Sequence, residues 1–599
     1  MKSLNNRFIY FLFSRGYRTF YNVKVFYCGM KDEVLFLDCE EHNLLPASPL
    51  YNDDLKKICT EKKYERVVLK TKYLSKTYDS NLRLKSISPF FMDVALESTT
   101  GFGKPLEEYT LPTGAIVRIY DDERGTQNIY CLEIPETKTK LKDLPKMYDA
   151  LQEYQSTGKI TQDFVDRWYD GYGILEHLMS DENITELNIN PPAFKTSMRI
   201  IHGKYQECSS NILVSDNFLN FLLTRLKMDT GRPLNKAQPQ IDGEINVRGV
   251  NARVAGIISP FSVFGVGFSI RKHRERPWTL PLFIKNKSVN PLFAGFMSLV
   301  ISHGRAFLTA GPRGSGKTSL LGSLLLEILQ RYRIITIEDT QELPINDYKK
   351  LGFDILPLKV RSALIDDSLE IPFDKGLRTS LRLGDSALIV GEVRSVEAKI
   401  LYEAMRVGAM SNVVAGTIHA DDPYGVYDRV VNDLGVPKGS FKSTDIIVIQ
   451  NLIKDPSGVG RKRRVIQVTE VLKHWEGEPE FQDLFVYNPK IDALEPTEVL
   501  LSGKSVTLKN IMSRTEGYKD YNSVLDDMYL RAWAKYELLK KSKGKEKYLE
   551  AAFSSNANNL YMLLTKKLKP MDSRANMDKF KQEFSRGLDG ILSGGSDAK

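Results

Sequence analysis

The stretch Ala306-Phe-Leu-Thr-Ala310 followed by Gly311-Pro-Arg-Gly-Ser-Gly316-Lys317-Thr318 decides the fold of this chain. A short apolar run of the kind found in buried strands leads into the pattern G-x-x-x-x-G-K-T, and a helical pattern follows over 317–330. Glycines let such a loop curl so that backbone N–H groups point inward, and the amino end of the helix adds partial positive charge. We therefore expect a phosphate-binding P-loop made of Gly311, Pro312, Arg313, Gly314, Ser315, Gly316, Lys317, Thr318 and Ser319.

Strands and helices alternate on both sides of this loop, over about 283–490. Apolar strands are expected at Ile334–Ile337, Ala387–Val390 and Val413–Thr417, and helical patterns at 292–302, 375–383 and 396–407 separate them. Such alternation is typical of a parallel sheet covered by helices on both faces. The sequence predicts an α/β domain here.

Three side chains follow these strands directly and are candidates for chemistry. Glu338 follows the first strand, Glu392 follows the second after one glycine, and His419 follows the third. The carboxyl ends of parallel strands share one edge of a sheet, where ligands bind. Lys317 would contact the β- and γ-phosphates and Thr318 would hold Mg²⁺, so ATP and Mg²⁺ are the expected ligands. The alternative is that these polar residues only end their strands.

The chain has 599 residues, which predicts several domains. We expect a basic and aromatic extension at 1–60, an α+β domain at 61–275, a linker at 276–282 broken by prolines, the α/β domain at 283–490 and a lysine-rich helical extension at 491–599. In the α+β domain, Ile116–Ile119 and Ile129–Ile134 predict a hairpin.

The composition excludes several classes of protein. With 42% hydrophobic and 27% charged residues the chain is neither fibrous nor wholly disordered, and no apolar run approaches the roughly 20 residues that span a bilayer. Five cysteines at irregular positions indicate a reducing, cytosolic setting rather than a disulfide framework. Cys28, Cys39, His42 and Cys59 could gather around zinc, although their spacing is irregular.

The formal net charge is +9, and its distribution matters more than its size. Residues 1–30 mix five basic residues with nine aromatic ones and contain no acid, which suits an anionic lipid surface or a partner, or packing on the chain's own domain. Other basic clusters, such as Arg461-Lys-Arg-Arg464, lack the aromatic platforms of a nucleic-acid groove and are expected in solvated loops.

The order of these motifs resembles a known family. The P-loop, Ile337-Glu-Asp-Thr-Gln-Glu-Leu343, Ile389-Val-Gly-Glu-Val-Arg394 and Ala415-Gly-Thr-Ile-His-Ala420 are similar to the Walker A, Asp box, Walker B and His box of type II and type IV secretion ATPases. Their archaeal branch, which includes the motor ATPases of archaella and adhesion pili, is the most similar.

The resemblance implies a RecA-like ATPase domain preceded by a nucleotide-capping amino-terminal domain and joined to it by a short hinge. It implies that Glu338 polarises the attacking water, that Glu392 holds Mg²⁺ through water and that His419 lies near the γ-phosphate. Arg253 and Arg271 match arginines that reach the nucleotide from the amino-terminal domain. Arg382 and Arg394 match basic family positions, with ion pairs to Glu342 or Asp385 as the alternative.

The resemblance further implies a homohexamer in the cytoplasm, at the inner face of the cell membrane. Its motion would drive a polytopic membrane platform protein during filament assembly or protein secretion. The sequence does not distinguish an archaellum from an adhesive pilus or a secretion system. A DNA-translocating P-loop motor and a scaffold that binds ATP without hydrolysing it are the alternatives, although no specific nucleic acid is expected.

Overall fold

The computed structural model divides into two compact units, residues 1–273 and 274–599, which we call the amino-terminal and carboxy-terminal units. The structure describes residues 25–31, 34–39, 66–71, 74–79, 84–89, 94–96, 102–121, 127–138, 144–160, 162–193, 195–274, 276–360, 373–380, 383, 386–394, 397–407, 413–454, 456 and 461–594. Residues 1–24, which carry most of the basic and aromatic segment, lie outside these ranges.

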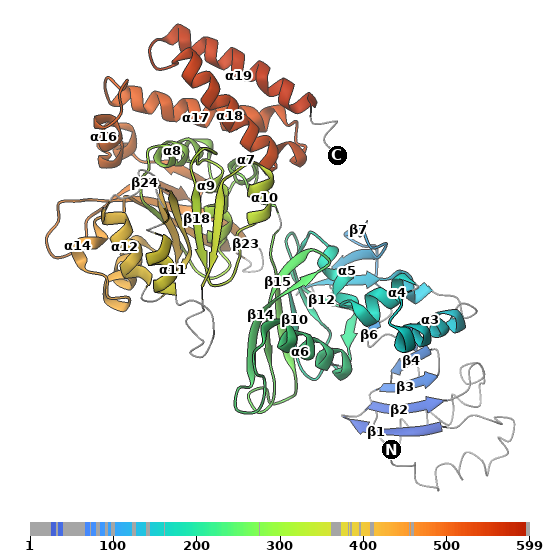
Figure 1. Cartoon of the computed structure of the whole chain (residues 1–599). Coiled ribbons are helices and arrows are strands. Elements are labelled where there is room, and N and C mark those ends of the chain that lie inside the picture. Colours follow the sequence, from blue (N-terminus) through green and yellow to red (C-terminus); the bar gives the residue numbers. More distant parts are fainter. Residues whose placement is uncertain are drawn as a thin grey trace, which may run out of the picture. The chain divides into compact units, whose positions relative to one another are not determined.

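The amino-terminal unit contains two large sheets (Figure 1). Its first sheet has the order β1-β2-β3-β4-β5, in which only β2 and β3 are parallel. Its strands are β1 (Val25–Lys31), β2 (Val34–Cys39), β3 (Arg66–Thr71), β4 (Leu74–Asp79) and β5 (Leu84–Pro89). The predicted boundary at residue 60 is therefore wrong, because β2 pairs with β3 across it.

The second sheet has the order β14-β15-β16-β10-β11-β12-β9-β8-β7. Its strands are β7 (Glu107–Thr110), β8 (Ile116–Asp121), β9 (Asn128–Glu133), β10 (Ile184–Ile189), β11 (Arg199–His202), β12 (Gln206–Ser210), β14 (Gln240–Val247), β15 (Val250–Ile257) and β16 (Gly267–Lys272). The antiparallel β8–β9 pair confirms the predicted hairpin. Two short strands, β6 (Val94–Leu96) and β13 (Ile212–Val214), pair with each other, and the helices are α3 (Leu144–Thr157), α4 (Asp163–Val165), α5 (Ile174–Ser180) and α6 (Asp216–Thr230).

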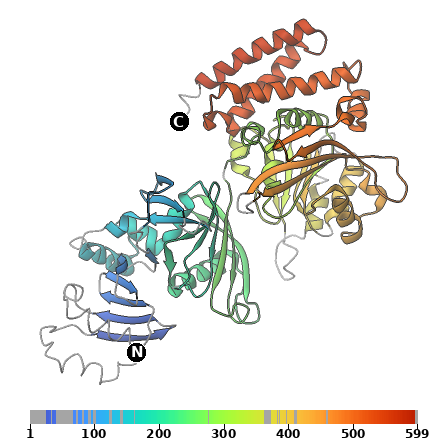
Figure 2. The same ribbon diagram turned by 180° about the vertical axis from the view of Figure 1, so that it is seen from behind.

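The carboxy-terminal unit is built on a nine-stranded sheet of order β19-β18-β20-β21-β17-β22-β23-β24-β25. Its strands are β17 (Phe307–Ala310), β18 (Ile334–Glu338), β19 (Ile355–Lys359), β20 (Ala387–Val393), β21 (Val414–Ile418), β22 (Ile446–Lys454), β23 (Arg461–Val471), β24 (Phe481–Asn488) and β25 (Ala493–Pro496). The first six strands in this order are parallel, as expected, and β23 to β25 extend the sheet in antiparallel pairs. This antiparallel edge, drawn in orange in Figure 2, was not predicted from the sequence.

Alternate residues of the parallel strands enter two separate cores. Ile389 and Val448 pack with α8 (Pro291–Ser302) and α9 (Lys317–Leu325) on one face. Leu388 and Ile447 pack with α12 (Glu397–Val407), α13 (Pro423–Asp428) and α14 (Lys438–Phe441) on the other. A parallel sheet covered on both faces explains why its strands are apolar throughout.

The carboxy-terminal helices continue the first of these cores. They are α15 (Glu498–Leu501), α16 (Val506–Ser513), α17 (Tyr521–Lys541), α18 (Ala551–Leu568) and α19 (Arg574–Gly594). Met528 of α17 and Leu508 of α16 share a buried core with Phe293 of α8. Because β25 also joins the sheet, residues 491–594 are an integral part of this unit rather than a separate helical extension.

The expected linker at 276–282 is partly helical. Helix α7 (Leu280–Lys285) begins inside it, with Thr279 as its amino-terminal cap. Pro281 lies in the first turn, where a backbone N–H has no partner within the helix, so proline starts this helix instead of preventing it.

Candidate functional site

The P-loop connects β17 to α9 as the sequence predicts. Gly311, Gly314 and Gly316 have φ angles of +150°, +79° and +97°, which favour glycine. Ser315 is fully buried, Arg313 is exposed and Ser319 lies in the first turn of α9. The loop thus has the backbone freedom that a close approach of phosphate requires.

Lys317 is buried at the start of α9, with 7% of its surface exposed. Its Nζ lies 2.9 Å from the Gly311 carbonyl oxygen, 3.0 Å from that of Pro312 and 3.2 Å from His419 Nδ1. Burial lowers the pKa of Lys317 to about 8, although the charges of Glu392 and Glu342 oppose this shift. A buried ammonium held by neutral groups is well suited to pair with an anion.

Glu392 lies near the end of β20, between a histidine and an arginine. Its Oε1 is 3.0 Å from His419 Nε2, and its Oε2 accepts a hydrogen bond from Arg394 Nη2. Burial would raise the pKa of Glu392, but His419 and Arg394 together lower it to about 2. Arg394 Nη1 also donates to Asp339 Oδ2 at 3.1 Å. Among the described residues Arg394 therefore pairs with Glu392 and Asp339, and Asp385, one of the two partners suggested by the sequence, lies outside the described residues.

Lys317, His419, Glu392, Arg394 and Asp339 thus form a continuous polar chain, which we call the P-loop cluster. Its members come from α9 and from the ends of β18, β20 and β21, because these neighbouring parallel strands end at one edge. If the Lys317 ammonium donates to His419 Nδ1, then His419 carries its proton on Nε2, and this N–H points toward Glu392.

Glu338 ends β18 and is 4% exposed. Its Oε1 accepts hydrogen bonds from the backbone N–H groups of Glu342 (3.0 Å) and Leu343 (3.2 Å). Burial raises its pKa to about 8, and these two hydrogen bonds oppose the shift. A methyl group added at Gly391 would lie 2.7 Å from Glu338 Cγ, so only glycine leaves room for this side chain.

Sequence reasoning did not assign a site role to Glu342. Its Oε2 accepts a hydrogen bond from Thr318 Oγ1 at 2.9 Å, so a carboxylate lies beside the hydroxyl expected to hold Mg²⁺. The only signal in the sequence is its place four residues after Glu338, where the backbone turns back onto the Glu338 carboxyl group. The Thr318 hydroxyl and the ionised Glu392 carboxylate are oxygen donors of the kind Mg²⁺ prefers.

Arg253 and Arg271 lie in the amino-terminal unit. They are direct cross-strand partners on β15 and β16. Arg253 forms two hydrogen bonds with Asp242, at 2.6 Å and 3.2 Å, and Arg271 Nε lies 3.6 Å from Glu186 Oε2. Like charges placed opposite each other repel, and these two carboxylates offset that repulsion. The structure brings the two arginines together, while their role toward a nucleotide stays a prediction.

Arg382 and the predicted zinc ligands His42 and Cys59 lie outside the described residues, and Cys28 and Cys39 belong to β1 and β2. Among the residues that the structure does describe, no cluster of His, Cys, Asp or Glu is arranged to hold a metal ion by itself. In the same part of the chain, no helix is both long and apolar enough to cross a membrane.

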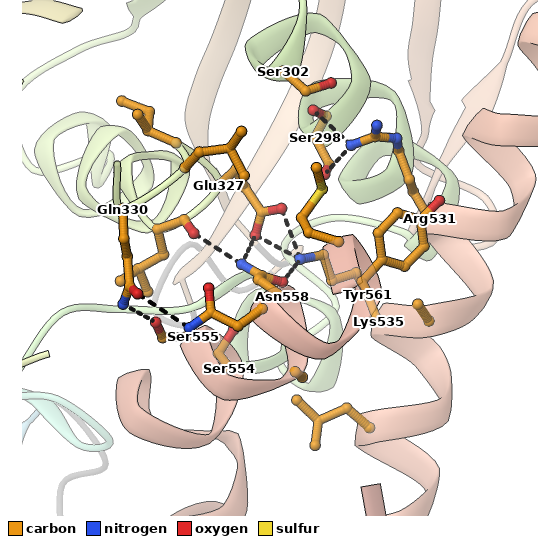
Figure 3. A pocket seen from close by; sticks show the side chains of 18 of the residues that line it. Ser298, Ser302, Glu327, Gln330, Arg531, Lys535, Ser554, Ser555, Asn558 and Tyr561 are labelled. Atoms are coloured by element: carbon orange, nitrogen blue, oxygen red, sulfur yellow. Dashed lines mark hydrogen bonds and ion pairs between the residues drawn. The ribbon is translucent and has the colours of Figure 1, made fainter. Parts of the chain in front are cut away.

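A second buried polar cluster joins the carboxy-terminal helices to α8 and to the end of the P-loop helix (Figure 3). Lys535 Nζ of α17 contacts both carboxylate oxygens of Glu327, at 2.6 Å and 2.7 Å, and Asn558 of α18 contacts the same pair. Asp527 accepts hydrogen bonds from Tyr518, Tyr561 and Arg531, and Arg531 also donates to Ser298 of α8. We call these residues the interhelix cluster.

Comparison with known proteins agrees with the motifs of this site. The model of a family described as "Type II/IV secretion system protein" matches residues 199–479. A putative conjugal transfer protein of Mycobacterium tuberculosis is 28% identical over 314 residues, which cover 51% of this chain and 86% of that protein.

An uncharacterized protein of Methanocaldococcus jannaschii is 30% identical over 235 residues, covering 38% of this chain and 80% of the relative. Among solved structures, the Legionella pneumophila ATPase DotB aligns at 15% identity and a TM-score of 0.37, covering 62% of this chain and 90% of DotB. On the family match and these relatives, the chain belongs to the family of type II/IV secretion system proteins.

Proposed function

We propose that this chain is a motor ATPase that hydrolyses ATP to drive assembly of a type IV pilus-like filament, or protein secretion, through a membrane platform protein. The observation that carries the proposal is the P-loop cluster, in which Lys317, His419 and Glu392 meet at the sheet edge beside the buried Glu338. Family membership supports the link to secretion and pilus systems.

The residues divide the work by their chemistry. The P-loop amides and Lys317 would bind the phosphates, and Thr318 and Glu392 would hold Mg²⁺, which would supply positive charge to those phosphates. Glu338 Oε2 accepts the proton of the attacking water. A carboxyl group whose pKa lies near neutrality suits that exchange, because it both takes up and releases a proton at physiological pH.

Arg253 and Arg271 are proposed to complete the nucleotide site from the amino-terminal unit. Guanidinium suits this task because it stays charged and pairs two phosphate oxygens at once. Differential contact with the γ-phosphate would favour a closed arrangement of the units before hydrolysis and an open one afterwards. Around a homohexameric ring at the inner face of the membrane, this motion would move the platform protein.

The first test is Mg²⁺-dependent ATP turnover by the full chain, the Glu338→Gln variant and a Glu403→Gln control. Glu403 is an exposed carboxylate on α12 outside the P-loop cluster. Loss of the base should reduce turnover on the order of 10²–10⁴-fold while nucleotide binding persists, and the control should match the wild type. Absence of turnover in the wild type at concentrations where rings form would instead support the scaffold alternative.

Two further measurements address the motor's class. Solution mass in Mg²⁺ and a non-hydrolysable ATP analogue should approach six times the 68.1 kDa of one chain. Added duplex DNA should leave ATP turnover unchanged if the motor does not act on nucleic acid. DNA phosphates bind proteins mainly through basic surfaces, and such binding is sensitive to salt. Strong stimulation by DNA would favour the nucleic-acid motor instead.

A further inference from the structure

Strands β22 and β23 form an antiparallel hairpin next to the P-loop. Strand β22 runs parallel to β17, the strand that leads into the loop, and β23 pairs with β22 on its other side. The register between β22 and β23 shifts between Ile449 and Gln450, which marks a bulge. Bulges beside active sites often redirect a side chain. The extra residue is Ile466 of β23, because Ile449 lies opposite Gln467 whereas Gln450 lies opposite Val465, so Gln450 borders the bulge.

Gln450 touches both ends of the P-loop. A methyl group added at Gly311 would lie 2.0 Å from the Gln450 carbonyl oxygen, so the Gln450 backbone lies close against the first glycine. One added at Gly316 would lie 3.3 Å from Gln450 Nε2, so the side-chain amide borders the last glycine. A single residue therefore limits the space available to the whole loop.

The side-chain amide of Gln450 is fully buried, and neither Nε2 nor Oε1 has a hydrogen-bond partner among the described residues. The hydroxyl of Ser315, within the P-loop, is buried and unpartnered in the same way. An unpaired buried amide is unfavourable, and an apolar side chain of similar size would fill this space better. Packing alone gives no reason for glutamine at this position.

Arg463 holds the middle of the loop. Its Nε donates to the Gly314 carbonyl oxygen at 2.9 Å, and its Cδ would lie 3.4 Å from a methyl group on Gly316. The sequence predicted a solvated loop at 461–464, and this is wrong because these residues open β23. The next residue, Arg464, is buried and pairs with Asp492 instead, so the two adjacent arginines have different partners.

We propose that Gln450 and Arg463 are positioning residues that hold the P-loop in the shape that accepts the phosphates of a nucleotide. Gln450 fixes its two ends and Arg463 its centre, and the free amide atoms of Gln450 pair with loop groups when the loop closes on phosphate. The inference rests on the proposed function, because it assumes that this loop binds nucleotide.

The test uses the full chain and measures MgADP affinity by calorimetry together with the melting temperature without nucleotide. The variants are Gln450→Leu, Gln450→Glu, Arg463→Ala and Arg463→Lys. Arg461→Ala is the matched control, because it removes an exposed arginine from the same strand. Lys317→Ala reports separately on the proposed function, since it removes the phosphate-binding ammonium.

We expect Gln450→Leu to melt at or above the wild-type temperature yet bind MgADP roughly tenfold more weakly, as when hydrogen bonds that shape a site are lost. Arg463→Ala should weaken binding similarly, and Arg463→Lys, which keeps a donor in place, should recover part of the loss. Gln450→Glu should bind at least as weakly as Gln450→Leu, because a buried carboxylate beside the phosphates is both unpaired and repulsive. Arg461→Ala should bind like the wild type.

Two results overturn the inference. Binding by Gln450→Leu and Arg463→Ala within about twofold of the wild type, while Lys317→Ala loses binding, would leave the proposed function intact and make both residues structural only. A wild type that does not bind MgADP would refute the proposed function and this inference together.

Discussion

The P-loop cluster and the interhelix cluster both bury charges in the carboxy-terminal unit, but they satisfy them differently. In the interhelix cluster, Lys535 faces both oxygens of Glu327, and Asp527 has three hydrogen-bonding neighbours. Burial would raise the pKa of Asp527, yet Arg531 and the two tyrosines lower it overall. These charges stabilise one another, and the cavity beside them is only about 40 Å³.

Around the P-loop, the buried polar groups are not all paired with one another. Burial brings the pKa of both Lys317 and Glu338 to about 8, from opposite directions, and the Gln450 amide and the Ser315 hydroxyl are unpartnered among the described residues. Buried polar atoms without a hydrogen-bond partner in the described part of the chain thus gather around the P-loop, whereas the buried charges of the interhelix cluster pair with one another. This contrast supports the proposed chemical role of the first cluster and predicts a structural role for the second.

The largest expected effect is the loss of the Lys317 charge. Lys317→Met should lower ATP turnover on the order of 10²–10³-fold or more, because a charged group aimed at the phosphates is lost. Its melting temperature should not fall, since a buried ammonium held by neutral carbonyls is replaced by an apolar chain. Steady-state turnover and thermal melting of the same sample measure both. Retained turnover would place the phosphate site elsewhere.

Breaking the interhelix cluster should produce the reverse pattern. Lys535→Met leaves the Glu327 carboxylate buried without its cation and should destabilise α17 by about 3–5 kcal/mol. Hydrogen exchange of the α17 amides reports this free energy directly. Adding Glu327→Leu should recover much of the loss. If the double variant is no better than the single one, the pair does not act as a unit.

Glu338 predicts a pH dependence of stability. Its folded pKa of about 8 lies above the ordinary value of 4.5, so the folded state binds the extra proton between these limits. The contribution of the Glu338 carboxyl group to the free energy of unfolding is at its full value below about pH 4.5. It decreases toward pH 8, by at most about 1.4 kcal/mol per pH unit. The free energies of unfolding in urea of the wild type and of Glu338→Gln should therefore diverge as the pH rises from 5 to 9, with the variant becoming the more stable of the two. Parallel curves would contradict the raised pKa.

The smallest effect should come from an exposed ion pair in the same unit. Lys285 Nζ lies 2.7 Å from Glu546 Oε1, and the Glu546 side chain is 65% exposed. Lys285→Ala should change stability by only about 0.2–1 kcal/mol, because solvent screens the pair. Urea unfolding of Lys285→Ala and Lys535→Met side by side measures the difference between the exposed pair and the buried pair. Equal losses in the free energy of unfolding would mean that burial does not make one ion pair more important to stability than the other.

Local sequence was sufficient for the residues at the ends of the parallel strands. Glu338, Glu392, His419 and the P-loop each lie at or just after the end of an apolar strand, and parallel strands bring such ends to one edge. The β8–β9 hairpin was predictable for the same reason, because its two strands are close in the sequence.

Long-range pairing decided the rest. The β2–β3 pair across residue 60, the antiparallel strands β23 to β25 and the packing of α17 on α8 join segments whose own patterns do not specify a partner. Arg463 and Arg464 show this most sharply, since two adjacent arginines in one basic run bind the P-loop and Asp492 respectively. The sequence by itself determined which chemical groups are present and which strands present them. Only the tertiary structure decided which neighbours satisfy each group, because a buried charge or amide depends on contacts made far along the chain.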